Sequence, residues 1–162
     1  MMKTNSAALL FLKAVLVLLA LLALAFCLFA IPGMASRDAA AHPETAYLQY
    51  PFLLSAYLLF SLFFIALYKT FKLLAFIGRN QPFSKESIHA LKTIKYCALA
   101  IAFCFIAGLA FLIFVIGGDI AGLFTLCMIC IVASAAVCAF AALLEKLTVQ
   151  AIRLKEENDL TV

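Results

Sequence analysis

Charged residues are scarce in this sequence. Only 12% of its 162 residues are charged, whereas 68% are hydrophobic and the mean hydropathy is +1.18. Soluble domains are roughly half apolar and about a quarter charged, so this composition excludes an ordinary water-soluble domain. A lipid bilayer is the solvent that fits, and the sequence predicts an all-α polytopic membrane protein.

Tryptophan is absent, whereas phenylalanine occurs 16 times, mostly inside long apolar runs. A phenyl ring packs against lipid or another helix without needing a hydrogen-bond partner. We therefore interpret these rings as packing rather than as a stacking platform. The net charge of +4 arises from basic residues beside apolar runs, so it does not argue for direct nucleic-acid binding.

Histidine is also rare, and the two histidines, His42 and His89, are predicted to lie on opposite sides of the membrane. Cys127-Met-Ile-Cys130 has the spacing of a redox or zinc pair, but no further ligands are near it in sequence. All the cysteines fall inside or at the edge of apolar runs, where oxidants do not reach them. We expect core packing, with neither a metal site nor disulfides, for the six: Cys27, Cys97, Cys104, Cys127, Cys130 and Cys138.

Aspartate, glutamate, arginine and histidine are missing from the interiors of the long apolar runs, and Lys13 can extend its ammonium group to the inner membrane surface. A proton-coupled exporter is expected to use a carboxylate within the membrane, so this class is disfavoured. A quinone-dependent disulfide-forming enzyme would present cysteine pairs in outer loops, and the predicted outer loops contain none. Because no convergent polar site is evident, we expect no enzymatic activity and no cofactor.

Four apolar runs approach or exceed the roughly 20 residues needed to cross a bilayer. The connection Gly117–Asp119 is so short that the last two spans must be antiparallel neighbours. The first outer loop, Pro32 to Tyr50, either holds a short helix around Ala39 or has no regular structure. A single membrane domain, 1–162, is predicted, with spans at approximately 9–31, 52–74, 88–116 and 120–144, a cytoplasmic loop at 75–87 and a cytoplasmic tail at 145–162.

Basic residues predict the orientation. Eleven of the twelve lysines and arginines fall on one side of this topology, and Arg37 is the exception. Basic residues stay on the cytoplasmic side of short loops, so both termini are predicted to be cytoplasmic in the inner (plasma) membrane. A cleaved signal peptide is the alternative for the first run, but the apolar core of this run exceeds the roughly 7–15 residues of such a peptide, and Lys13 interrupts the approach to that core.

Helices are predicted to extend beyond the membrane on the cytoplasmic side. Helical spacing continues past Tyr68 to Gly78, a residue suited to the left-handed turn that ends a helix. Ser84 suits an N-cap, so the third helix is expected to begin near Lys85. Two apolar stripes recur at helical spacing, one of Ile88, Leu91 and Ile94 and one of Leu144, Leu147, Ala151 and Leu154.

The run Gly78-Arg79-Asn80-Gln81-Pro82-Phe83-Ser84 and the ending Leu154–Val162 together resemble a bacterial membrane family known as domain of unknown function two-nine-seven-five. The resemblance covers nearly the whole chain. It implies a small inner-membrane protein, often encoded beside a very small helix-turn-helix regulator, and it assigns no catalytic residue.

The resemblance leads to a hypothesis of a non-enzymatic regulatory role, in which the cytoplasmic end binds a small cytoplasmic DNA-binding regulator. The alternative is a transport or immunity protein that acts through the helix bundle. Small residues in the spans also permit a homo-oligomer, although one chain can bury those faces itself. The candidate docking residues are Arg79, Asn80, Pro82, Phe83, Ser84, Glu156, Glu157, Asn158, Asp159 and Leu160.

Overall fold

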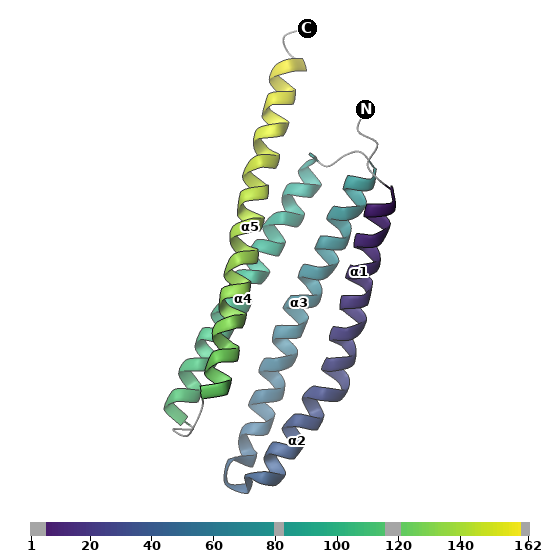
Figure 1. Cartoon of the computed structure of the whole chain (residues 1–162). Helices are drawn as coiled ribbons and strands as arrows, with labels where there is room; N and C mark the ends of the chain where they lie inside the picture. Colours follow the sequence, from purple (N-terminus) through teal and green to yellow (C-terminus); the bar gives the residue numbers. More distant parts are fainter. Residues whose placement is uncertain (1–5, 80–82, 116–120, 160–162) are drawn as a thin grey trace.

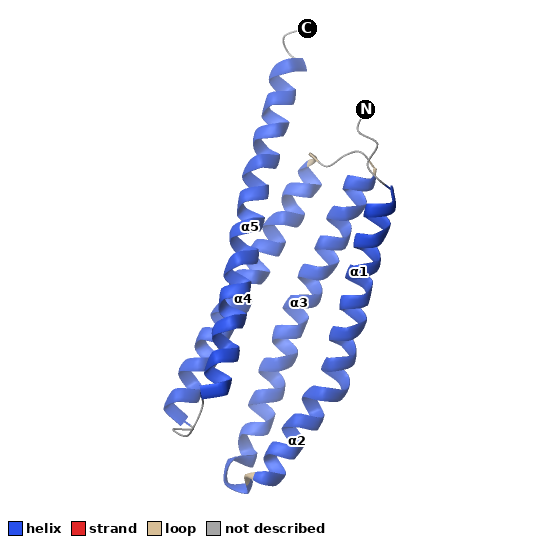
Figure 2. Ribbon diagram, viewed as in Figure 1, coloured by secondary structure: helices blue, strands red, loops and turns tan. Residues whose placement is uncertain are grey.

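The computed structural model describes residues 6–79, 83–115 and 121–159, and in these ranges the chain forms helices and no strands. This confirms the all-α prediction. Four long helical rods lie alongside one another (Figures 1 and 2). In chain order the elements are α1 (Ser6–Ala25), a π-helical turn (Phe26–Ala30), α2 (Ile31–Ala41), a 3-10 helix (Pro43–Leu48), α3 (Gln49–Gly78), α4 (Lys85–Val115) and α5 (Ala121–Asp159).

The first rod is nearly continuous from α1 to α2 and runs well past the predicted span. In the π-helical turn, the Ile31 N–H donates to the carbonyl of Phe26, five residues earlier. Pro32 follows directly, within the first turn of α2. Proline has no N–H to donate, and a wider turn is a common way for a helix to accommodate such an interruption. Of the two alternatives for the first outer loop, the helical one is therefore correct.

The helix ends near the predicted loop 75–87 agree with the sequence pattern. The third rod continues to Gly78, and α4 begins at Lys85. One detail is wrong: Gly78 is the last helical residue and does not adopt a left-handed conformation, while Arg79 follows at φ −91° and ψ 11°. A Cβ atom at position 78 would lie 3.5 Å from Cδ2 of Leu9, so this end of α3 lies close to the start of α1.

The helices form a row rather than a closed ring. Within the described residues, α3 packs against α1 and α2 on one side and against α4 on the other, and α4 packs against α5. The contact between α4 and α5 confirms that the last two spans are neighbours. Residues 117–119, which were predicted to connect them, lie outside the described residues. The start of α1 and the last turns of α5 lie at the same end of the molecule (Figure 1).

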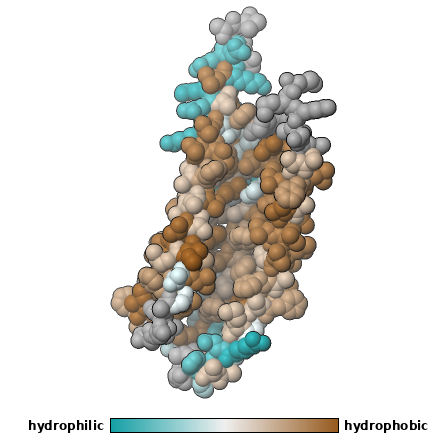
Figure 3. All heavy atoms as spheres, viewed as in Figure 1, coloured by the Kyte–Doolittle hydropathy of each residue, from teal (hydrophilic) through white to brown (hydrophobic). Residues whose placement is uncertain are grey.

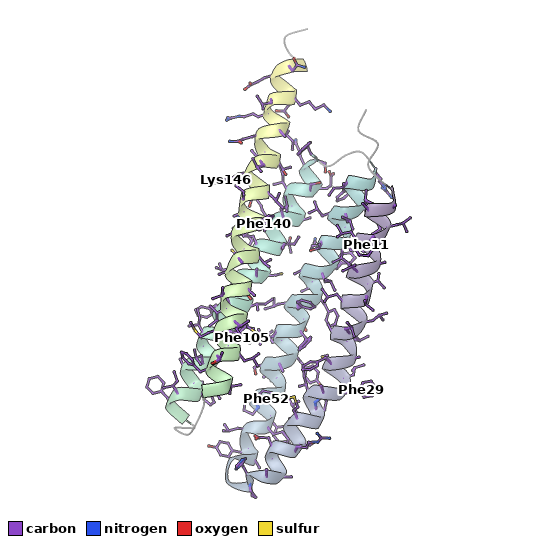
Figure 4. The ribbon with its side chains drawn as sticks, in the orientation of Figure 1. Phe11, Phe29, Phe52, Phe105, Phe140 and Lys146 are labelled. Atoms are coloured by element: carbon purple, nitrogen blue, oxygen red, sulfur yellow. The ribbon has the colours of Figure 1, made fainter. Side chains whose placement is uncertain are left out.

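Apolar side chains cover the outside of the rods. Four helical segments are long and apolar enough to cross a membrane, namely Ala7–Ala41, Ala46–Gly78, Lys85–Phe114 and Gly122–Asn158. Phe11 and Phe29, both labelled in Figure 4, are largely exposed. Hydrophobic surface extends along most of the length of the molecule, and hydrophilic surface gathers at its two ends (Figure 3). Hydrocarbon rather than water therefore solvates this surface, as expected for a protein of four transmembrane helices.

Replacing Gly78 with alanine tests the conformation at the end of α3. Because Gly78 is helical and its Cβ would make only an ordinary van der Waals contact, we expect G78A to stabilise the protein by about 0.5–1 kcal/mol. A left-handed Gly78 would instead make the substitution destabilising. The measurement is the melting temperature in detergent, followed with a thiol-reactive fluorophore that reports exposure of the buried cysteines. The matched control is G33A. A Cβ atom at position 33 in α2 would have no neighbour within 4 Å, so this substitution changes only the helix propensity.

Candidate functional site

Charge gathers at the end of the molecule where α3 ends, α4 begins and α5 projects. We call this the basic end and define it as residues 69–79 at the end of α3 and just after it, 83–95 just before and at the start of α4, and 144–159 of α5. Nine of the twelve lysines and arginines lie in it: Lys69, Lys72, Arg79, Lys85, Lys92, Lys95, Lys146, Arg153 and Lys155.

Ser84 determines where α4 starts. Its hydroxyl oxygen accepts a hydrogen bond from the Ser87 N–H at 3.2 Å, and the Ile88 N–H donates to its carbonyl at 3.2 Å. The Ser84 and Ser87 hydroxyls are also 3.0 Å apart and share a hydrogen bond. The N-cap prediction is thus confirmed. Since Ser87 is completely buried, this bond also satisfies a hydroxyl that water does not reach.

The basic end contains much of the buried core of the described structure. Leu74 of α3, Leu91 and Ile94 of α4, and Thr148 of α5 are all buried. The buried Thr148 hydroxyl donates to the Leu144 carbonyl at 2.8 Å, one turn earlier in α5. Buried side chains of α3, α4 and α5 therefore gather at the level where charged side chains begin, with α4 packed between α3 and α5.

An ion-pair cluster joins α4 to α5 beside this core. The Lys95 ammonium donates to Glu145 Oε2 at 2.6 Å, and Lys92 Nζ lies 4.0 Å from Oε1 of the same carboxylate. The Glu145 side chain is only 15% exposed, and a half-buried carboxylate needs such partners. This cluster was not predicted from the sequence. The signal was available, because Lys95 and Glu145 lie at similar distances along the chain from the short connection between two antiparallel helices.

A basic groove lies on the other side of α4, between α4 and α3. Its volume is about 280 Å³, and it is lined by Lys69, Lys72, Lys85, Glu86, His89 and Ala90. Ala90 is buried, Lys69 is half-buried and the others are exposed. Cationic side chains outnumber the one carboxylate, so the groove favours an anion. No group of three metal-binding side chains occurs in the described residues.

The candidate docking residues that the structure describes lie in two places. Arg79 and Phe83 are exposed in the connection between α3 and α4, and Ser84 is half-buried and engaged in capping. Glu156, Glu157 and Asn158 are exposed on the last turns of α5, which extend beyond the ends of α3 and α4 (Figure 1). Asp159 ends α5. Asn80, Pro82 and Leu160 lie outside the described residues.

All six cysteines are free thiols. Cys27, Cys97 and Cys127 are buried, and Cys104, Cys130 and Cys138 are half-buried. This agrees with the interpretation of the cysteines as small packing residues.

Removing the charge of Glu145 tests the ion-pair cluster. In E145Q, Lys95 keeps its position in the α4–α5 interface but loses its counterion, so we expect the melting temperature in detergent to fall by several degrees. The matched control is E156Q, which removes the same charge from an exposed position on the last turns of α5. An equal change in both variants would show that Glu145 contributes no more than a surface carboxylate.

Comparisons with known proteins place the chain in a family. The family model described as "Protein of unknown function (DUF2975)" matches residues 33–162. The chain is 40% identical over 159 residues to the "Uncharacterized membrane protein YoaS" of Bacillus subtilis (strain 168), covering 98% of this chain and 99% of that protein. No solved structure matches the chain. Because the family model covers most of the chain and the relative aligns along nearly its whole length, this membrane protein belongs to the family described as protein of unknown function DUF2975.

Proposed function

We propose that the protein is a multi-pass protein of the bacterial plasma membrane that tethers a small helix-turn-helix DNA-binding regulator through its basic end. The observation that supports this proposal is the shape of α5. Its 39 residues extend past the ends of the neighbouring helices (Figures 1 and 4). A helix that leaves the bundle in this way offers a surface that the rest of the chain does not cover.

The projecting part of α5 has an apolar stripe. Leu147 is 50% exposed and Leu154 is 66% exposed, and with the half-buried Ala151 between them they occupy one face of the helix at spacings of four and three residues. Charged residues such as Lys146 and Arg153 interrupt the sequence around the stripe, as they do on a helix in water. A water-exposed apolar stripe on a helix is a common way to bind a partner helix.

Charge at the tip of α5 fits the same partner. Glu156 and Glu157 lie in the last turns of α5, on the far side of the basic residues. DNA-binding proteins carry basic surfaces that contact phosphates, and an acidic tip attracts such a surface. A regulator held there would have part of its DNA-binding surface covered, which is a direct way to restrain it.

The proposal requires the basic end to face the cytoplasm. Nine of the twelve lysines and arginines lie there, and Arg37 lies at the opposite end of the first rod, in α2. The positive-inside rule then favours cytoplasmic termini.

Reporter fusions test this orientation. Alkaline phosphatase fused after Val162 should be inactive and green fluorescent protein fused there should fluoresce, because the first needs the oxidising exterior and the second folds in the cytoplasm. Insertions at Ser36, in α2, should give the opposite pattern. An active phosphatase after Val162 would contradict the proposal.

Affinity purification from the native host tests the docking surface. Full-length protein in mild detergent should retain a small DNA-binding protein, identified by mass spectrometry. The variant L147S/L154S should lose it about tenfold or more, because two apolar contacts of an interface are removed. V149S is the matched control, since Val149 is 46% exposed but lies on the opposite face of α5.

Two outcomes would count against the proposal. Equal retention by L147S/L154S and the control would show that the stripe is not the docking surface. Absence of any DNA-binding protein from the full-length sample would favour the alternative role in transport or immunity, in which the helix bundle acts directly.

A further inference from the structure

The lysines around the first turns of α4 fall into two groups. Lys92 and Lys95 face α5 and share the Glu145 carboxylate. Lys69, Lys72 and Lys85 line the basic groove on the α3 side, and no ion pair involves them in the part of the chain that the structure describes. Lys72 Nζ lies 5.8 Å from the centre of the Phe76 ring, a contact that leaves its charge available. Three lysines face one carboxylate, that of Glu86, so the groove carries a net positive charge.

Two tyrosines indicate the depth of this groove relative to a bilayer. Tyr68 precedes Lys69 on α3 and is 63% exposed, and Tyr96 follows Lys95 on α4 and is 62% exposed. On both helices, apolar sequence lies on one side of the tyrosine and lysines lie on the other. Exposed tyrosines are enriched at membrane–water interfaces. The basic groove thus begins at the level of lipid headgroups.

An apolar groove continues along the same helix. It has a volume of about 440 Å³ and is formed on α4 by Tyr96, Leu99, Ala100, Ala102, Phe103 and Ile106. His89 of the basic groove and Tyr96 and Phe103 of the apolar groove are separated by seven residues each, or close to two helical turns. They therefore lie on one strip of α4, along which the apolar groove follows the basic groove.

We propose that these two grooves form a binding site for one anionic phospholipid. The phosphate is held by Lys69 and Lys72 from α3 and by Lys85 from the first turn of α4, where the helix dipole adds to the attraction. An acyl chain lies in the apolar groove below Tyr96. Glu86 at the rim of the basic groove accepts hydrogen bonds from headgroup hydroxyls, which suits a glycerol headgroup. This site does not depend on the proposed regulator.

Native mass spectrometry of the detergent-purified protein tests the site, with phosphatidylglycerol and phosphatidylcholine of equal chain length as probes. The wild type should bind one phosphatidylglycerol in preference to phosphatidylcholine. K69Q/K72Q should weaken phosphatidylglycerol binding by about tenfold or more, since each lysine near an anionic headgroup contributes roughly a fivefold effect. The matched control K146Q/K155Q removes the same charge from exposed positions of α5 and should bind as the wild type does.

Four results would overturn the proposal. An equal loss in K146Q/K155Q would reduce the effect to net charge. Equal binding of the two lipids by the wild type would remove the preference for an anion. Displacement of the lipid by soluble glycerol phosphate at similar concentration would assign the groove to a free anion. If K69Q/K72Q lowers the melting temperature, K85Q tests the same site from α4. Phosphatidylglycerol binding by K85Q equal to that of the wild type would also contradict the site.

Discussion

Every backbone N–H and C=O group that crosses hydrocarbon must find its hydrogen-bond partner within the protein, because no water is present there to replace it. A helix meets this requirement inside one segment, without help from its neighbours. The four rods can therefore stand in a row and expose most of their side chains, an arrangement that would be unstable in water. Even the π-helical turn at Phe26–Ala30 follows this constraint, because it keeps the Ile31 N–H bonded just before Pro32, which has none.

Tight tertiary packing is then needed mainly where the helices leave the hydrocarbon. At the basic end, Leu91 and Ile94 are buried, Ser87 is completely buried and Glu145 is enclosed by two lysines. Water competes for hydrogen bonds there, and the hydrophobic effect favours the burial of apolar surface. The basic end is therefore the part of the molecule that is held together in the manner of a soluble domain, and both proposed binding surfaces include parts of it.

Much of the fold could be predicted from local patterns. The start of α4 at Ser84 and Lys85 was predictable because helix capping depends on residues within one turn. The four rods were predictable because the length and hydropathy of an apolar run are enough to identify a membrane-spanning helix. Gly78 was assigned the wrong conformation because glycine is compatible with both a helix and a left-handed turn, and only its surroundings decide between them. The extent of α2 was left open for a similar reason, since Pro32 can either end a helix or begin one.

The candidate site was harder to predict, because it depends on which faces of different helices meet. Lys69 and Lys85 are 16 positions apart. Both served to predict the orientation of the protein in the membrane, and that prediction uses only the side of the bilayer on which a lysine lies. Predicting the groove between them also requires knowing which face each of α3 and α4 turns toward the other. The Lys95–Glu145 pair likewise depends on the register of α4 against α5, which the length of their connection limits but does not determine.

The uninterrupted length of α5 has a mechanical consequence. After Gly122 the helix contains neither proline nor glycine, so it has no natural hinge between the membrane and its tip. The segment from Glu145 to Asp159 is a rigid arm about 21 Å long at about 1.5 Å per residue. A tilt of about 10° where Lys95 holds Glu145 would displace the tip sideways by about 4 Å, by the same geometry. A small change in the tilt of the membrane-embedded part of α5 is thereby converted into a displacement close to the width of one side chain at the tip.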